Sequence, residues 1–284
     1  MTKQLLSKIE GCYSSMSKGH KRIADYITEN YDKAAFMTAA KLGDTVGVSE
    51  STVVRFASEL GFSGYPQLQK VLQEVVKSRL TSVQRMEAAG GEDMLEHAFS
   101  SDIETIKVTR ESISREAFNA SVEAINRAKH IYVLGVRSAA SLASFAAFYL
   151  NFVYDSVTLI EPAGTGEAFD QAFRINKDDV CIAISFPRYS KQTINMLRFI
   201  SDRGATVISV TDSENSPIAQ FATHLLLARS SMVSFVDSLV APLSLINALI
   251  AAAASEKSGE VYSNLSSLEN IWDEYQIYQT HEDE

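Results

Sequence analysis

The chain contains few of the residues that build metal sites, disulfide frameworks and membrane spans. Only two cysteines, Cys12 and Cys181, occur in 284 residues, and they lie in different predicted units, so neither a disulfide nor a cysteine metal site is expected. The five histidines include no pair at metal-ligand spacing. No apolar run is long enough to cross a bilayer, and the start, MTKQLLSKIEG, lacks the apolar segment of a signal peptide. We therefore expect a cytoplasmic protein without metal, cofactor or membrane contact.

Charge is distributed unevenly along the sequence. The whole chain has a net charge of −9, yet residues 1–80 contain 11 Lys and Arg against 8 Asp and Glu, which leaves −12 for the remainder. A mildly basic N-terminal part fits a chain in which only that part binds a polyanion. Ordinary variation between solvated surfaces explains the split equally well. Hydrophobic residues make up 46% of the chain, enough for one large domain or two ordinary ones.

The spacing of apolar residues changes near His130. Residues 1–80 have helical spacing, and we expect a helical linker at 81–108, marked by Gly90-Gly91. Further on, five short runs rich in β-branched residues alternate with stretches long enough for helices: 131–136, 156–161, 180–186, 206–211 and 224–228. This alternation predicts an α/β fold, a doubly wound five-stranded parallel sheet within residues 109–258. A helical tail is expected at 259–284.

The stretch LGDTVGVSESTVVRFASELGF, residues 42–62, has the pattern of a helix-turn-helix. Gly47 suits the positive φ of a tight turn, and Gly43 is the small residue expected where the two helices cross. Ser49 is a favourable N-cap for the second helix. The apolar positions fall where the helices would pack together: Leu42, Val46, Val48, Val53 and Phe56.

The second helix of this motif is expected to present a polar side near its N-terminus, the end that enters the major groove in such motifs. Arg55 can donate two hydrogen bonds to guanine or hold a phosphate, and the hydroxyls suit phosphates or base edges. Glu59 also faces outward in this prediction. A plain helical hairpin is the alternative, but the turn glycine, the N-cap and the buried pattern together favour DNA binding. The predicted DNA contacts are Ser49, Ser51, Thr52 and Arg55, flanked by Lys41 and Tyr65 on the phosphate backbone.

Polar loops follow the first and third predicted strands, in LGVRSAAS (134–141) and SFPRYSKQT (185–193). Ligands of doubly wound sheets bind outside the carboxyl ends of the strands, where a helix N-terminus attracts anions. These loops therefore predict a site for a small anion. The predicted contacts are Arg137, Ser138, Ser185, Arg188, Ser190 and Thr193.

Signatures of catalysis are missing from the same loops. The first loop has Gly-Val-Arg-Ser-Ala-Ala where a dinucleotide site would have G-x-G-x-x-G, and no G-x-x-x-x-G-K motif occurs. No histidine lies in either loop to serve as the base that hydrolysis or isomerisation requires. We therefore expect no catalytic residues and a protein that is not an enzyme.

The N-terminal segment VGVSESTVVRFASELGFSGYPQLQ resembles the helix-turn-helix of RpiR-type bacterial transcription regulators, especially in STVVRF, LGF and GY. The body resembles the sugar isomerase (SIS) domain that follows it in that family, so the resemblance covers nearly the whole chain. In such domains the phosphate is typically held by a loop of the form S-x-S-G-x-T. Here Ser185 and Ser190 match, Pro187 and Arg188 replace the middle serine and the glycine, and Arg137 stands where glycine is common. The added arginines fit either a phosphate or a carboxylate.

The resemblance implies a sequence-specific DNA-binding regulator, a repressor or an activator, whose SIS domain senses a small anionic metabolite, usually a phosphorylated sugar. It also implies a homodimer or tetramer formed through the SIS domains and bound to double-stranded operator DNA. An aldose–ketose sugar-phosphate isomerase is the main alternative, because enzymes use the same kind of body. A sugar-binding or scaffold module without either activity is a third possibility.

Overall fold

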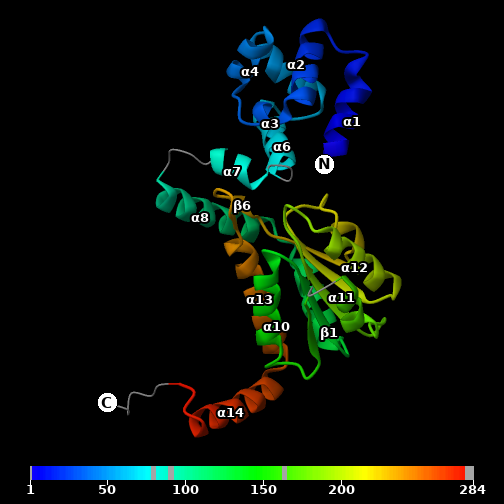
Figure 1. The fold of residues 1–284 in the computed structure, drawn as a ribbon, viewed down its shortest axis with the longest axis vertical. Helices are drawn as coiled ribbons and strands as arrows, with labels where there is room; N and C mark the ends of the chain where they lie inside the picture. The colour runs from blue at the N-terminus through cyan, green and yellow to red at the C-terminus, as the bar shows by residue number, and fades with distance from the viewer. Residues whose placement is uncertain (1, 78–80, 89–92, 162–164, 279–284) are drawn as a thin grey trace. The chain divides into compact units, whose positions relative to one another are not determined.

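The computed structural model describes residues 2–77, 81–88, 93–161 and 165–278, so the expected break at Gly90-Gly91 and the last six residues lie outside the described residues. The chain divides into two compact units, Met1–Gly91 and Glu92–Glu284. Figure 1 shows the first as a cluster of helices and the second as a sheet with helices. The segment expected as a linker, 81–108, is shared between them: its first helix belongs to one unit and its second to the other.

The first unit is entirely helical in its described residues, as predicted from the spacing of its apolar residues. Its core is formed by side chains that are completely buried, among them Ile23, Ile27, Leu42, Phe56 and Leu68. The helices are α1 (Thr2–Tyr13), α2 (Lys18–Glu29), α3 (Tyr31–Ala34), α4 (Ala39–Val46), α5 (Glu50–Glu59), α6 (Tyr65–Lys77) and α7 (Ser82–Ala88).

The second unit contains the predicted five-stranded sheet. All neighbouring strands are parallel, in the order β2-β1-β3-β4-β5. Strands β1 and β3 are buried along their full length because helices cover both faces of the sheet. The strands are β1 (Ile131–Gly135), β2 (Val157–Ile160), β3 (Val180–Ile184), β4 (Thr206–Thr211) and β5 (His224–Leu227). The predicted fold class is therefore confirmed.

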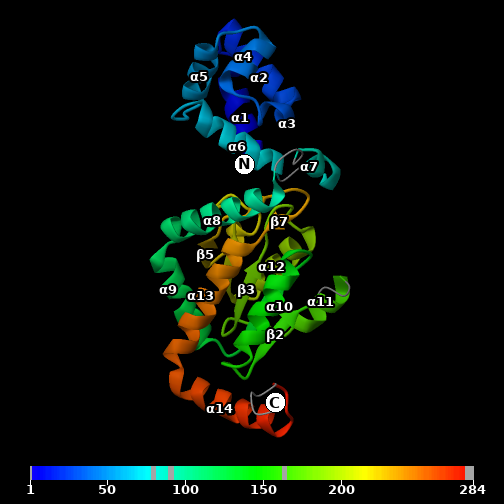
Figure 2. The same cartoon turned by 90° about the vertical axis from the view of Figure 1, so that its left-hand side faces the viewer.

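Helices cover the two faces of this sheet separately. One buried cluster joins the sheet to α9, α10 and α13, through residues such as Ile125, Ala143 and Leu249. The other joins it to α11 and α12, through Ala168 and Leu197. Figure 2 shows α9, α10 and α13 along the same face. The helices of this unit are α8 (Met94–Ser112), α9 (Arg115–Arg127), α10 (Ala139–Leu150), α11 (Thr165–Ala172), α12 (Lys191–Asp202), α13 (Val240–Glu256) and α14 (Ser258–Glu274), with a 3-10 turn, η1 (Ala219–Phe221).

Helix α8 is attached to the segments that follow β5. The backbone N–H of Arg229 donates to Oγ1 of Thr109 at 2.9 Å, and Oγ of Ser238 donates to Oδ1 of Asp102 at 2.5 Å. Ser238 belongs to an antiparallel pair of two-residue strands, β6 (Ser231–Met232) and β7 (Asp237–Ser238), which the sequence analysis missed because such short strands show no periodicity. The first helix of the second unit is thus hydrogen-bonded to the part of the chain beyond the carboxyl end of the sheet.

Candidate DNA interface and effector site

The turn between α4 and α5 has the geometry expected for a helix-turn-helix. Gly47 takes the left-handed conformation, with φ of 71°, and its N–H donates to the carbonyl of Gly43. Ser49 then caps α5, accepting a hydrogen bond at 3.3 Å from the N–H of Thr52. A β-carbon on Gly43 would lie 2.8 Å from the carbonyl oxygen of Val48, so the crossing admits no larger residue without a backbone shift. This explains why glycine occupies the position.

The outer side of α5 contains the polar groups predicted to meet DNA. Ser51 and Arg55 are exposed and Thr52 is half-buried, whereas Val53 and Phe56 are fully buried on the opposite side. The guanidinium of Arg55 lies along the helix, where Nε donates to the carbonyl of Ser51 at 3.3 Å and Nη2 to Oγ1 of Thr52 at 3.5 Å. The oxygen of Ser49 lies 2.9 Å from Oγ of Ser51 and 2.8 Å from Oγ1 of Thr52. The N-terminal turn therefore offers three hydroxyls and one guanidinium on a single surface.

Two residues beside this surface were not identified from the sequence. Arg22 of α2 is exposed, and its Nη1 lies 3.2 Å from the position that a β-carbon on Gly47 would occupy, which places a cation directly at the turn. Val54 on α5 is 39% exposed and presents the kind of apolar group that contacts thymine methyls. The position of Arg22 depends on how α2 packs against the motif, and no local pattern reports it.

Glu59 is placed differently from its expected role as a free outward carboxylate. Its Oε2 lies 2.5 Å from Nδ1 of His20, whose ring also packs edge-on against Phe56. The contact joins α2 to the end of α5, 39 residues apart in sequence. Glu59 therefore has a structural partner and helps to hold the second helix in place.

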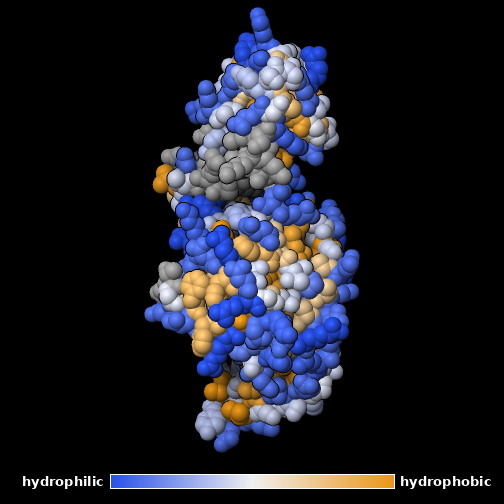
Figure 3. Space-filling model, turned by 90° about the vertical axis from the view of Figure 1, so that its right-hand side faces the viewer, coloured by the Kyte–Doolittle hydropathy of each residue, from blue (hydrophilic) through white to orange (hydrophobic). Residues whose placement is uncertain are grey.

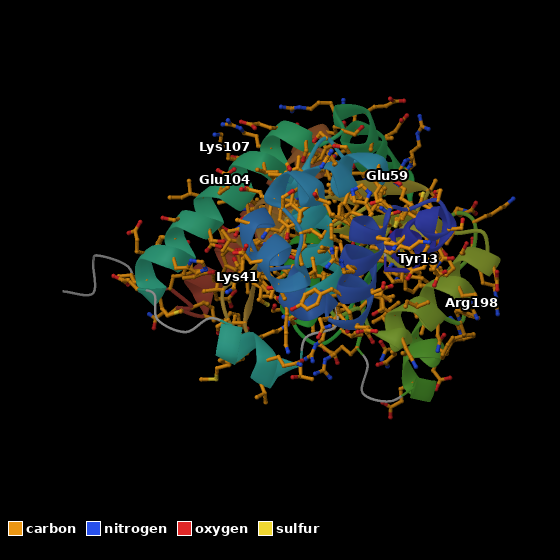
Figure 4. All side chains as sticks on the ribbon, turned by 90° about the horizontal axis from the view of Figure 1, so that it is seen from above. Tyr13, Lys41, Glu59, Glu104, Lys107 and Arg198 are labelled. Carbon is orange, nitrogen blue, oxygen red and sulfur yellow. The ribbon has the colours of Figure 1, made fainter. Side chains whose placement is uncertain are left out.

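Of the two residues predicted to flank the DNA on its backbone, one is at the surface and one is not. Lys41 is exposed in the first turn of α4 (Figure 4). Tyr65 is only 3% exposed, and its hydroxyl donates to the carbonyl of Met37 at 2.7 Å. Burial raises the pKa of Tyr65 to about 12. The prediction that Tyr65 contacts DNA is therefore corrected: its ring lies in the interior of the unit, and its hydroxyl is bonded to the backbone there.

The two polar loops of the second unit lie next to each other. Strands β1 and β3 pair directly, with Gly135 opposite Ile184 at their carboxyl ends, so the loops that follow them start side by side. A β-carbon on Gly135 would lie 2.6 Å from the carbonyl oxygen of Ala139. Because glycine has no β-carbon, α10 can begin close to the strand. Residues far apart in sequence are thereby brought to one edge, as the anion-site prediction requires.

The first loop is exposed. Arg137 has a left-handed backbone, with φ of 58°, and its side chain faces solvent. Ser138 is the N-cap residue of α10, but its side chain makes no capping hydrogen bond. Its hydroxyl is therefore not engaged with the helix terminus that it precedes.

The second loop combines buried hydroxyls with an exposed arginine. Ser185 is 5% exposed, and Thr193 is fully buried with no hydrogen-bond partner for Oγ1 among the described residues. Ser190 caps α12, accepting from the N–H of Gln192 at 3.2 Å. Arg188 is exposed. A buried hydroxyl without a partner is energetically costly, so Thr193 marks a place where a ligand atom or a water would be favourable.

An acidic residue that the sequence analysis missed lies at the same edge. Asp212 directly follows β4, and its Oδ1 accepts hydrogen bonds from the hydroxyls of Tyr189 at 2.6 Å and Thr211 at 3.2 Å. Burial raises the pKa of Asp212, and the hydrogen bond from Tyr189 opposes that shift. The rule that ligands bind beyond strand ends could have identified it, because Asp212 is the first residue after the fourth predicted strand.

A hollow of about 420 Å³ lies at the opposite, amino edge of the sheet, lined partly by Asp178, Thr206 and His224. Lys129 and Asp178 neutralise each other there, with Nζ and Oδ2 2.6 Å apart. This interaction lowers the pKa of Asp178 and raises that of Lys129. None of the predicted site residues lines it, so the carboxyl edge is the better candidate for an anion.

Comparison with protein families identifies both units. Residues 3–79 match the helix-turn-helix domain of the rpiR family, and residues 124–252 match the SIS domain. The chain belongs to the RpiR family. The SIS match includes both polar loops, and the helix-turn-helix match includes the whole of α4 and α5.

Relatives that match about three quarters of this chain are named as HTH-type transcriptional regulators. HexR of Escherichia coli is 26% identical over 226 residues, covering 77% of this chain and 75% of its own length. An uncharacterized HTH-type transcriptional regulator of Haemophilus influenzae is 26% identical over 230 residues, covering 78% of this chain and 79% of its own. The chain is thus an HTH-type transcriptional regulator with a SIS domain, as the sequence analysis predicted.

Solved structures agree with this fold. The sugar isomerase domain of an RpiR transcription factor from Sphaerobacter thermophilus is 30% identical, with a TM-score of 0.58, and the match covers 61% of this chain and 96% of that one. NanR of Vibrio vulnificus, solved in complex with ManNAc-6P, is 23% identical with a TM-score of 0.60 and covers 95% of this chain and 98% of its own. Among the described residues, no helix is long and apolar enough to span a membrane.

Proposed function

We propose that this regulator binds a specific operator through α5 and that its SIS unit binds a small anionic metabolite, a phosphorylated sugar, which changes the operator affinity. The observation that carries the DNA part is the exposed N-terminal turn of α5, where Ser49, Ser51, Thr52 and Arg55 share one surface. In helix-turn-helix proteins, this end of the second helix contacts base edges in the major groove. Lys41 and Arg22 are the proposed phosphate contacts.

The effector part is supported by the chemistry of the carboxyl edge. Arg137 and Arg188 supply positive charge, Ser138 and Ser190 lie at helix N-termini, and Thr193 has a buried hydroxyl without a partner among the described residues. These groups suit a phosphate, because helix N-termini and guanidinium groups both favour anions. The NanR relative, solved with a sugar phosphate, supports the same ligand class.

We also propose that the protein acts as a homodimer or tetramer. Two recognition helices on one face of B-DNA lie about 34–36 Å apart, so a dimer would recognise a near-palindromic operator. Hydrophobic side chains interrupt the polar surface of the SIS unit on the side drawn in Figure 3, which is compatible with contacts between copies. The effector would act by favouring one arrangement of the two copies through its own contacts.

The isomerase alternative has one supporting observation. A putative sugar-phosphate isomerase from Listeria monocytogenes shares the fold, with a TM-score of 0.51 and 20% identity over 58% of this chain. Asp212 is a buried acid at the carboxyl edge, but its carboxylate is already engaged by Tyr189 and Thr211. Because neither loop offers a histidine, we propose a sensor without catalytic activity.

Two experiments test the proposal. Selection of bound fragments from genomic DNA, followed by gel shift, should yield a near-palindromic operator; the absence of any enriched fragment would contradict the DNA part. A thermal-shift screen of sugar phosphates and small carboxylates should raise the melting temperature with one class, because a ligand that binds only the folded state stabilises it. Turnover of a sugar phosphate would instead support the isomerase.

A further inference from the structure

Helix α8 has an apolar stripe that no part of the described chain covers. Leu95, Phe99, Ile103 and Ile106 follow one another at intervals of four, four and three residues, which places them along one side of the helix. Their exposed fractions are 69%, 64%, 66% and 36%. The helix buries the neighbouring side, where Thr109 and Asp102 are bonded to the rest of the unit. We call these four residues the α8 stripe.

Two more exposed apolar residues lie in the hairpin that is bonded to α8. Phe235 and Val236, between β6 and β7, are 55% and 52% exposed, and the same hairpin is bonded to α8 through Ser238 and Asp102. Met94, at the start of α8, is also 40% exposed. Scattered exposed apolar residues are common, but several of them gathered on one helix and the hairpin bonded to it indicate a surface that a partner covers.

The charges bordering the α8 stripe indicate which partner fits. Acidic residues, Asp93 and Glu96, lie toward the start of the helix, and basic residues, Lys107 and Arg110, lie toward its end. Glu96 and Lys107 follow Leu95 and Ile106 by one residue each, so both border the same edge of the stripe. Among the described residues, neither forms an ion pair with its own chain. An antiparallel copy of this helix would place Glu96 of each copy against Lys107 of the other, which gives two equivalent ion pairs.

A parallel copy would instead bring like charges together. Glu96 would face Glu96 and Lys107 would face Lys107, which is unfavourable across a helix pair. In the antiparallel arrangement the stripe is also self-complementary, with Phe99 of one copy opposite Ile103 of the other about a twofold axis near residue 101. A twofold contact uses the same patch on both copies, as this geometry requires.

We propose that a second copy of this chain covers the α8 stripe, with the two α8 helices packed antiparallel. The proposal rests on the homo-oligomer of the proposed function and names the surface that forms it. Because α8 is the first helix after the DNA-binding unit, the contact would join the two chains next to the segments that lead to their recognition helices.

The decisive test is the mass of the full-length protein in solution without DNA. We expect the combined variant Phe99→Asp with Ile103→Asp to sediment at half the wild-type mass, with a dissociation constant at least about tenfold higher, because it buries charge at the centre of the interface. Both positions are exposed in the single chain, so the circular dichroism spectrum should stay unchanged, and the melting temperature should fall only by the amount that the lost association accounts for. A variant that keeps the wild-type mass and dissociation constant would overturn the proposal.

Exchange of charges tests the antiparallel orientation. Glu96→Lys alone and Lys107→Glu alone should each weaken association by about three- to tenfold, and the two together should restore it. Glu104→Lys makes the same change of charge at an exposed position of the same helix, about 100° around the helix from Ile103, and should leave association unchanged. Failure of the double exchange to restore association would overturn the antiparallel pairing.

The same measurements separate this surface from the proposed function. A wild-type protein that is monomeric at all concentrations would overturn both the α8 contact and the proposed oligomer. A wild-type oligomer that is indifferent to the α8 variants would overturn only the contact. Operator binding is measured separately by gel shift, so neither result depends on it.

Discussion

The two units hold their candidate binding residues at different depths. In the helix-turn-helix unit, Ser51 and Arg55 are exposed on the outside of α5, whereas in the SIS unit Ser185 and Thr193 are buried. An exposed polar side suits a large, rigid partner that meets the protein along its surface. Buried hydroxyls suit a small ligand whose anionic group is enclosed. The depth of the polar groups therefore separates the two kinds of partner more clearly than their chemistry, which is similar in both units.

The units also differ in how far apart in the sequence the residues lie that determine the geometry of each candidate site. The turn, the cap and the crossing of α4 and α5 depend on residues within 42–62, with His20 as a distant addition. The candidate effector site at the carboxyl edge of the sheet depends on the pairing of β1 with β3. It also depends on the hydrogen bond between Tyr189 and Asp212, which are 23 residues apart. A change in a single residue should therefore act locally in the first unit and across loops in the second.

The largest expected effect is on operator binding. Arg55→Ala should weaken specific binding by about 10- to 100-fold, because one guanidinium contact to a base contributes ~1–3 kcal/mol. Arg127→Ala, which removes an exposed arginine from the SIS unit, is the matched control and should leave the affinity unchanged. Gel shift or fluorescence anisotropy measures both. Equal affinities for wild type and Arg55→Ala would contradict the proposal that α5 is the helix that contacts the operator.

The next effect concerns the stability of the first unit. Gly43→Ala should lower its free energy of unfolding by about 1–3 kcal/mol, because the new β-carbon would lie 2.8 Å from the backbone oxygen of Val48. Gly11→Ala in α1 introduces the same methyl group where no atom lies within 4 Å, so it should be neutral or stabilising. Urea denaturation followed by circular dichroism compares the two. A Gly43→Ala protein as stable as wild type would show that α4 and α5 can separate without cost.

A smaller effect is expected at the effector edge. Ser138→Ala and Ser185→Ala should each weaken effector binding by about tenfold, the value of one hydrogen bond to a charged group, and leave operator binding without effector unchanged. Ser201→Ala, an exposed serine in the last turns of α12, is the control. Calorimetric titration with the ligand found by thermal shift provides the affinities. Identical values for all three variants and wild type would exclude these serines from the site.

The smallest effect distinguishes packing from DNA contact at Tyr65. Tyr65→Phe should cost about 1 kcal/mol of stability through loss of the hydrogen bond to Met37, with operator affinity unchanged. Lys41→Ala should do the reverse, weakening DNA binding while leaving stability unchanged. Thermal melting and gel shift on the same samples separate the two, and reduced operator affinity for Tyr65→Phe at unchanged stability would restore the original interpretation.

The fold was predictable from the sequence because its signals are short-range. Alternating β-branched runs located all five strands of the large sheet, and Gly47 and Ser49 located the turn and the cap. The candidate site residues were chosen by residue type and by position in the sequence. Neither property shows whether a side chain is buried or exposed. Tyr65 illustrates the limit, because an aromatic hydroxyl at the start of a helix suits both a phosphate contact and a buried hydrogen bond.

What the sequence could not show depends on contacts between distant elements. The Glu59–His20 pair requires that α2 lie beside the end of α5, and the position of Arg22 at the turn has the same origin. Asp212 gains its role only when β4 lies next to β3 and Tyr189 reaches it. Each of these contacts follows from tertiary packing, which no local pattern encodes.

The hydrogen bond from the Arg229 N–H to the Thr109 hydroxyl has a consequence for how ligand occupancy could be observed. This hydrogen bond helps to protect the amide of Arg229 from exchange while α8 stays in place. Deuterium uptake at this amide therefore reports the attachment of α8 to the segment after β5, without a label on either the DNA or the metabolite. A metabolite that loosens or tightens this attachment will change the exchange rate of that single amide.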